Sequence, residues 1–279
     1  MMRMLKFYGY LGLMLILFAE INFSLNIMPF ASWYIVIVWY GAILFVDSLV
    51  YKIKGRSLIS TYPKEFLLML MVSLPFWLIF EFYNIFTFSW YYINYEWYVH
   101  VLDFTTIMPA IIEVFSLINA LDVGKRFDYA GKRMPLKGSR HSNAIKFIIL
   151  AGAFTAILPF IAPSFGFMFM WVGLFLFLDP LNYYLGKPSI IEKVSMGNKS
   201  ILLRLMLSGI IVGFFWELWN YQAYPKWVYS FHGAATSIKL FAMPLFGYLG
   251  YLPFALEVFL FYAFFRSFVF KTHNNLITV

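Results

Sequence analysis

Four glutamates lie within segments that otherwise consist almost wholly of apolar residues: Glu81, Glu113, Glu217 and Glu257. The first and third are each followed three positions later by an asparagine, Asn84 and Asn220. Residues three or four apart share one face of a helix, so each of these carboxyl groups should have an amide beside it. The second and fourth each follow a proline by four positions, Pro109 and Pro253, which again share a helix face.

Carboxyl groups at membrane depth can do proton chemistry, and they are costly to place there. An ionised carboxylate at the centre of a membrane helix costs on the order of 3 kcal/mol. A neutral carboxylic acid in a dry pocket can donate a proton, and two such groups can share one. We therefore take the four glutamates as candidate catalytic residues and the two asparagines as groups that orient them. The alternative is that each glutamate bonds to its asparagine or to another helix and only specifies packing.

Aromatic residues are concentrated around these glutamates. The chain contains 34 Phe, 20 Tyr and 9 Trp. Lipid-facing side chains and interfacial belts account for many of them. A π-face also stabilises a neighbouring cation, so carboxylic acids between aromatic walls would suit the protonation of an isoprenoid double bond. Besides Asn84 and Asn220, the residues expected to bind a substrate are Trp90, Trp216, Trp219, Trp227 and Tyr229.

The elements that must position these residues are membrane helices. Of the 279 residues, 62% are hydrophobic and 12% are charged, whereas soluble domains average about 25% charged residues. Several apolar segments approach the roughly 20 residues that cross a bilayer. We therefore expect an all-α integral membrane protein with about eight transmembrane helices, at 7–24, 30–50, 65–88, 99–120, 144–160, 164–181, 201–221 and 241–265.

The distribution of basic residues predicts the orientation of these helices. With the N-terminus inside, only Lys226 and Lys239 of the 21 lysines and arginines fall outside. Cytoplasmic loops carry such an excess, so we expect a multi-pass protein of the cell membrane with both termini in the cytoplasm. The same bias explains the net charge of +8 without a nucleic-acid partner. Lys226 is expected at the outer rim, in water or near an anionic headgroup.

The two halves of the chain resemble each other. The segment that begins at Trp39, "WYGAILFVDSLVYKIKGRSLI", aligns with "WVGLFLFLDPLNYYLGKPSII" from Trp171. The glutamate–asparagine pairs, the Trp-x-Tyr motifs and the Pro-x-x-x-Glu motifs recur in the same order. We predict two parallel four-helix repeats, 1–121 and 144–279, joined by a basic cytoplasmic linker, 122–143, with a pseudo-twofold axis along the membrane normal. Glu81 and Glu217 should then face a shared cavity from equivalent positions.

Other polar residues favour structural roles, and cofactor motifs are missing. Asp47 and Asp179 stand beside lysines at the inner ends of helices and are expected to form interfacial ion pairs. His100 and His232 are expected to be polar anchors at the outer surface. The chain has no cysteine, Glu-x-x-His pair, Gly-x-Gly-x-x-Gly, P-loop or Gly-x-Ser-x-Gly motif. We therefore predict no metal and no cofactor.

Short motifs in both halves resemble those of the integral-membrane carotenoid enzymes. Lycopene cyclase domains carry a membrane glutamate, a downstream Trp-x-Tyr and a Pro-x-Glu-Glu-Phe-type motif, and "MPAIIEVF" from Met108 and "LPFALEVFLFY" from Leu252 resemble the last of these. Carotenoid hydratases are the second such family. The adjacent second glutamate is missing here, and cyclase halves usually have three spans. The second half is also similar to an uncharacterised bacterial membrane family.

This resemblance implies a cyclase- or hydratase-like lyase or isomerase. Our leading hypothesis is a membrane enzyme that acts on a lipid-soluble isoprenoid, carotenoid-like, or on another lipid, by acid–base chemistry. A transporter or a proton- or solute-conducting protein that uses the same glutamates is the first alternative. A non-catalytic subunit of a membrane complex is the second. The expected partner is a membrane lipid or isoprenoid substrate, and a homo-oligomer or a membrane-complex partner stays open.

Overall fold

The computed structural model describes residues 3–128, 141–230 and 238–270. Seven helices in this part of the chain are long and apolar enough to cross a membrane: Phe7–Ser24, Phe30–Lys54, Pro63–Thr87, Trp97–Ala120, Asn143–Ile161, Ser200–Gln222 and Leu245–Val269. The predicted class, an all-α multi-pass membrane protein, is therefore confirmed. His232 and residues 129–140 of the expected linker lie outside the described residues.

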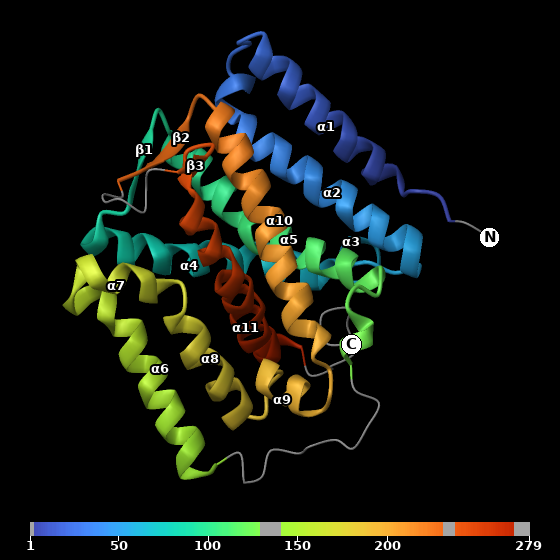
Figure 1. The fold of residues 1–279 in the computed structure, drawn as a ribbon. Coiled ribbons are helices and arrows are strands. Elements are labelled where there is room, and N and C mark those ends of the chain that lie inside the picture. Colours follow the sequence, from blue (N-terminus) through green and yellow to red (C-terminus); the bar gives the residue numbers. More distant parts are fainter. Residues whose placement is uncertain (1–2, 129–140, 231–237, 271–279) are drawn as a thin grey trace.

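The first half consists of four long helices and two short ones (Figure 1). The helix α1 (Phe7–Ser24) is followed by a 3₁₀ turn, η1 (Phe30–Trp33), and by α2 (Tyr34–Lys54). A short helix, α3 (Leu58–Thr61), leads into α4 (Pro63–Thr87), and α5 (Trp97–Ala120) completes the half. Gly55 ends α2 because its φ of 75° is a left-handed conformation that glycine adopts without strain.

The second half also combines long helices with short ones. A 3₁₀ turn, η2 (Lys125–Phe127), follows the first half. Then come α6 (Asn143–Ile161), α7 (Pro163–Met170), α8 (Gly173–Tyr184), α9 (Ile190–Ser195), α10 (Ser200–Gln222), η4 (Leu245–Gly250) and α11 (Tyr251–Val269).

The expected span 164–181 is therefore two short helices, because the backbone leaves helical geometry at Val172 (φ −129°, ψ −26°). The aromatic ring of the preceding residue, Trp171, packs between Phe80, Trp90 and Phe254. This break also frees amide groups in the first turn of α8, and one of them, from Phe175, donates to the Glu257 carboxyl group at 3.1 Å. Tertiary contacts thus stabilise the interruption.

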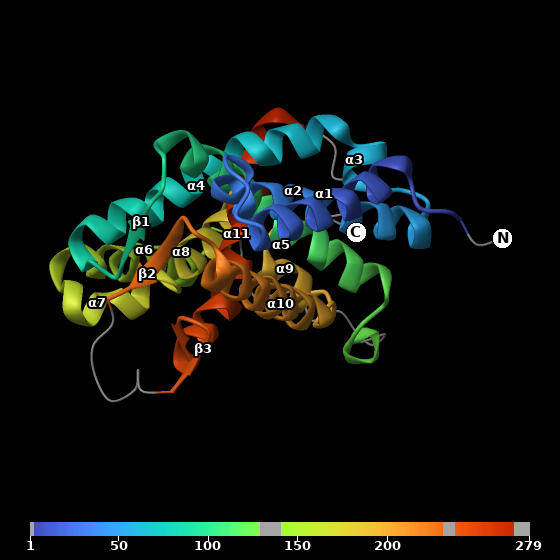
Figure 2. The same cartoon turned by 90° about the horizontal axis from the view of Figure 1, so that it is seen from above.

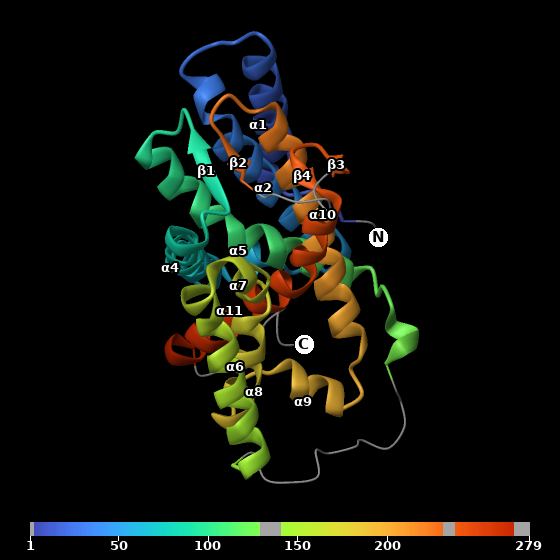
Figure 3. The same cartoon turned by 60° about the vertical axis from the view of Figure 1, so that its left-hand side comes forward.

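A pair of short strands joins the halves, and the sequence patterns did not predict it. The strand β1 (Trp90–Ile93) pairs antiparallel with β2 (Lys226–Tyr229) (Figure 3). Its register sets Trp90 opposite Tyr229 and Tyr92 opposite Trp227. The tryptophan of each Trp-x-Tyr motif therefore lies opposite the tyrosine of the other. A second pair, β3 (Lys239–Leu240) with β4 (Met243–Pro244), precedes η4.

The helix α11 runs through the middle of the molecule (Figures 1 and 2) and contacts α4, α5, α8 and α10. All of its side chains from Phe254 to Ala263 are buried. At its end, Arg266 donates to both carboxylate oxygens of Glu65 at 2.8 Å, and the two side chains are 3% and 8% exposed. This buried ion pair ties the last helix to the start of α4.

Asp47 and Asp179 do not form the ion pairs that we expected from the sequence. Each carboxylate instead accepts backbone N–H groups at the start of a short helix: Ile59 N–H donates to Asp47 at 2.9 Å, and Ile190 N–H donates to Asp179 at 2.7 Å. The first N–H groups of a helix have no partner within the helix, and a buried carboxylate can accept them. Each aspartate therefore bonds to these N–H groups and not to a solvated lysine. Both aspartates are helix-capping residues.

Candidate functional site

A cavity of about 620 Å³ lies where the two halves meet beside the strand pair. Its volume is within the usual range of roughly 300–1,000 Å³ for sites that hold small molecules. Six of the nine tryptophans line it: Trp39, Trp77, Trp90, Trp171, Trp216 and Trp227. Tyr92, Tyr229 and Tyr251 complete the aromatic wall. Four of the residues predicted to bind a substrate, Trp90, Trp216, Trp227 and Tyr229, are among the lining.

Glu81 lies behind this wall and holds three of its aromatic groups. Its Oε1 accepts the indole N–H of Trp77 at 2.9 Å, the indole N–H of Trp90 at 3.1 Å and the hydroxyl of Tyr92. All three donors line the cavity, whereas the glutamate itself does not. The carboxyl group therefore fixes the orientation of the wall and can exchange a proton with the cavity only through one of these donors.

Glu217 occupies the corresponding place in the second half and is fully buried. Its Oε1 accepts hydroxyl groups of Tyr229 and Tyr251, each at 2.6 Å. The indole of Trp227 donates to the Tyr229 oxygen at 2.8 Å, so it reaches the carboxyl group through the tyrosine. Among the described residues, no donor reaches Glu217 Oε2. The expectation that Glu217 faces the protein interior is confirmed.

Asn84 and Asn220 do not bond to the glutamates that they accompany in sequence. Asn220 accepts the N–H of Trp227 and donates to the carbonyl of the same residue, both at 2.9 Å. Asn84 does the same for Trp90, at 3.1 Å and 2.9 Å. Each amide is a clamp on a strand backbone. The asparagines therefore position the two Trp-x-Tyr motifs, and neither lines the cavity.

The remaining candidate residues lie away from the cavity. Trp219 packs edge-on against Trp39 with ring centroids 4.7 Å apart. Glu257 is fully buried beside the first turn of α8. Glu113 is 1% exposed, and its electrostatic neighbour is Asp47. Within the described residues, neither Glu113 oxygen accepts a hydrogen bond. The structure thus brings Glu81 and Glu217 to one site and leaves Glu113 and Glu257 outside it.

The strand tyrosines are proton donors over the whole physiological pH range. Burial and the adjacent Glu81 carboxyl group raise the pKa of Tyr92 well above its usual value, and burial and Glu217 do the same to the pKa of Tyr229. Both hydroxyls therefore stay protonated and donate to the carboxyl groups behind them. They form two short relays from the cavity to a glutamate.

Sequence patterns missed a polar stripe on α5 that lines the cavity. His100, Asp103 and Thr106 are three residues apart and share a helix face. Asp103 is 8% exposed, and within the described chain no donor reaches either carboxylate oxygen with hydrogen-bond geometry. The Tyr95 hydroxyl lies near this carboxylate, and burial together with Asp103 raises the pKa of Tyr95 well above its usual value. The polar residues at intervals of three after Trp97 could have indicated this stripe in the sequence. The same pattern is also typical of a helix end at the membrane interface.

Exposed apolar side chains surround the mouth of the cavity. Met168 at the end of α7 is 72% exposed, Phe246 in η4 is 70% exposed and Leu249 in η4 is 56% exposed. Side chains of this type are stable in contact with hydrocarbon rather than water. The lining therefore continues from the aromatic wall to a surface suited to lipid.

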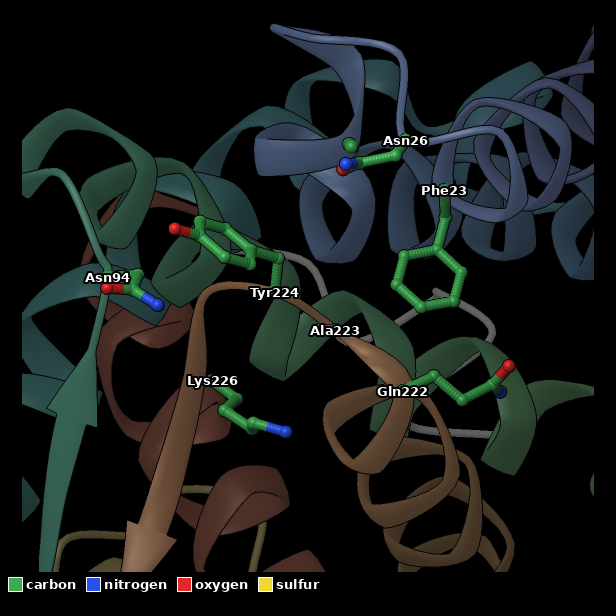
Figure 4. Close-up of a pocket in the computed structure, with 8 residues that line it drawn as sticks. Phe23, Asn26, Asn94, Gln222, Ala223, Tyr224 and Lys226 are labelled. Carbon is green, nitrogen blue, oxygen red and sulfur yellow. The ribbon is translucent and has the colours of Figure 1, made fainter.

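A second pocket, of about 430 Å³, lies next to the end of α10 and is more polar (Figure 4). Lys226, Asn94 and Gln222 contribute polar groups, and Phe23 and Tyr224 contribute rings. Lys226 lies on β2 directly opposite Ile93 of β1. Its expected place on the outer rim stays a prediction. The adjacent strand residue, Trp227, belongs to the lining of the larger cavity.

Fold and cavity together define the class: a multi-pass α-helical membrane protein with an aromatic-lined cavity between its halves. No protein-family model matches the chain, and no curated protein or solved structure shows significant similarity to it. Among the described residues, no group of three histidine or acidic side chains has the arrangement of a metal site. The function must therefore be inferred from the cavity itself.

Proposed function

We propose that this protein is a membrane enzyme that acts on a lipid-soluble isoprenoid, carotenoid-like, or on a similar lipid by acid–base chemistry. The observation that carries this proposal is the aromatic cavity whose wall includes two tyrosine hydroxyls bonded to membrane glutamates. An apolar substrate would enter through the exposed apolar mouth and lie against indole and phenol rings. These rings would stabilise positive charge on a substrate carbon.

Tyr92 and Tyr229 would transfer protons between the substrate and the glutamates. In the basic direction, a proton leaves the substrate carbon for the tyrosine oxygen while the tyrosine proton moves to the carboxylate. In the acidic direction, a protonated glutamate returns its proton to the tyrosine, whose own proton passes to a substrate double bond. Such positioned proton transfer contributes about 10²–10⁴ in rate. Glu81 and Glu217 are the acid–base pair of this proposal, and Glu113 has no part in it.

The proposal includes a repeat and an orientation. Two four-helix halves, related by a pseudo-twofold axis, would place the cavity in the outer half of the membrane with both termini in the cytoplasm. The support is a set of contacts that occur twice, because the asparagine clamp and the aspartate cap recur in both halves. The reciprocal register of the two Trp-x-Tyr motifs, with Trp90 opposite Tyr229 and Trp227 opposite Tyr92, has the same twofold relation.

Comparison of lipid extracts tests the enzymatic function. Cells with the gene, cells without it and cells with the double variant Glu81→Gln/Glu217→Gln would be extracted and their isoprenoid lipids compared by mass spectrometry. We expect one lipid to accumulate equally in the last two. Ser208→Ala is a matched control, because this buried hydroxyl of α10 bonds only within its helix. Identical profiles in all four strains would refute the enzyme.

Proton-coupled transport is a second candidate, and the broken helix favours it. Discontinuous helices in transporters point their N-termini at the bound group. Here the first turn of α8 points at the buried Glu257 carboxyl group, whose Oε2 accepts no hydrogen bond from the described residues. Proton flux into proteoliposomes that depends on Glu257, and not on Glu81 or Glu217, would support this function over the enzyme.

A further inference from the structure

Asp103 is the acidic group that lies closest to the open space of the cavity, because it belongs to the lining whereas Glu81 and Glu217 do not. Its side chain comes from α5, at the level where His100 and Thr106 face the same cavity. It is 8% exposed, and the Tyr95 hydroxyl, which also lines the cavity, lies near its carboxylate but outside hydrogen-bond geometry. A buried carboxylate is stabilised by several donors, so a ligand that donates to its free positions would complete the site.

Another part of the lining, in the second half, contributes no polar side chain. Aligning Pro109 with Pro253 and Glu113 with Glu257 pairs the polar stripe on α5 with a stripe of small or nonpolar residues in the second half. That stripe consists of Pro244, Gly247 and Gly250, and all three line the cavity. A Cβ at Gly247 would meet the Met243 side chain at 2.3 Å and one at Gly250 would lie 3.6 Å from the Trp171 ring, so these positions bring backbone and no polar side chain to the cavity. The two halves are thus unequal at this level.

The charge of the lining restricts the polar end of a ligand further. Among the described lining residues there is no lysine and no arginine, and the carboxyl groups of Glu81 and Glu217 lie directly behind the aromatic wall. Phosphate and carboxylate groups require basic partners or several free N–H donors. The lining offers one imidazole, of His100, and one indole N–H without an acceptor among the described residues, that of Trp39. Aromatic faces and an aspartate instead favour a hydrogen-bond donor, neutral or cationic.

We propose that Asp103 binds the polar end of an apolar lipid that carries one hydrogen-bond donor, a hydroxyl or an amine, and that the cavity rejects lipid phosphates. This inference rests on the proposed function and specifies its substrate class. The lipid tail would extend along the tryptophans toward the mouth at Met168 and Phe246. Asp103 would be a substrate-contacting residue.

A series of ligands with one tail and four polar ends tests the inference in purified full-length protein. The probes are a C20 isoprenoid hydrocarbon, geranylgeraniol, geranylgeranylamine and geranylgeranyl diphosphate. Binding is read from quenching of intrinsic tryptophan fluorescence, since six tryptophans line the cavity. We expect the alcohol and the amine to bind about tenfold more tightly than the hydrocarbon, the effect of one hydrogen bond. The diphosphate should bind most weakly.

The variant Asp103→Asn should abolish the advantage of the amine and leave hydrocarbon binding unchanged. Glu113→Gln is the matched control, because it makes the same chemical change on the same helix at a buried position away from the cavity. The wild-type series decides the question even if the Asp103 variant does not fold. A diphosphate that binds as tightly as the alcohol, or an unchanged series in Asp103→Asn, would overturn the inference alone. Absence of binding by all four probes would overturn the proposed lipid site itself.

Discussion

Replacing Glu217 by leucine or by glutamine separates what the carboxyl group holds from what it titrates. Glu217 is fully buried and accepts two tyrosine hydroxyls at 2.6 Å. Leucine removes the acceptor of both. Each orphaned buried donor costs about 1–3 kcal/mol, so Glu217→Leu should lower the free energy of unfolding by roughly 2–6 kcal/mol. Glutamine keeps a carbonyl oxygen at the same place and loses only the strengthening by charge, about 1 kcal/mol for each bond.

Thermal unfolding in detergent, followed by tryptophan fluorescence, measures these differences. We expect the stability to fall in the order wild type, Glu217→Gln, Glu217→Leu. Tyr251→Phe in the leucine background should restore part of the stability, because it removes a hydroxyl that has lost Glu217 as its acceptor. If leucine were no worse than glutamine, the tyrosines would have other acceptors and the reasoning about the wall would be refuted. If the folded Glu217→Gln protein no longer forms the lipid product, the loss would be due to the missing titratable proton and not to a change in structure.

Three further predictions concern the surroundings of the site. Asn220→Ala should cost about 2–4 kcal/mol in unfolding free energy, because the variant loses two buried backbone bonds; equal Tm values for variant and wild type would contradict the clamp. Arg266→Met should cost about 3–5 kcal/mol by leaving the buried Glu65 carboxylate without its guanidinium partner, and Glu65→Leu in that background should restore most of it; no recovery in denaturation curves would count against the ion pair. Burial and Glu217 raise the pKa of Tyr229, so its stabilising effect is complete below the ordinary tyrosine pKa of about 10 and is lost as the pH rises toward the folded value. Wild type should therefore lose more Tm than Tyr229→Phe between pH 9.5 and pH 11 (roughly the range above the ordinary pKa), and parallel pH profiles would show that this tyrosine is not coupled to the carboxyl group.

The sequence alone was sufficient for the class of protein and for the interior position of Glu217. Both follow from local physical chemistry. Apolar runs of the length of a bilayer must be helical because lipid offers no hydrogen bonds to the backbone. A carboxyl group in such a run must turn away from lipid because an unpaired one is too costly there. Neither argument depends on which helices are neighbours.

Local rules were insufficient wherever a polar group had several partners within reach. Spacing placed Asn220 on the same helix face as Glu217, and that was correct, but both of its hydrogen bonds go to the strand residue Trp227. Similarly, Asp47 was expected to pair with a lysine and instead caps α3. Sequence distance indicates which groups are adjacent on one helix. It does not indicate which loop folds back over that helix.

Residue types and their periodicity thus determined that this chain crosses a membrane and that it carries acids and aromatic rings at membrane depth. Tertiary structure decided which of those acids meet. The strand pair brings Glu81 and Glu217 behind one wall, the break before α8 holds Glu257 elsewhere, and Asp103 faces the open cavity. The physical reason is that hydrogen bonds and burial act between segments far apart in the chain, and a residue's own neighbours in sequence do not contain that information.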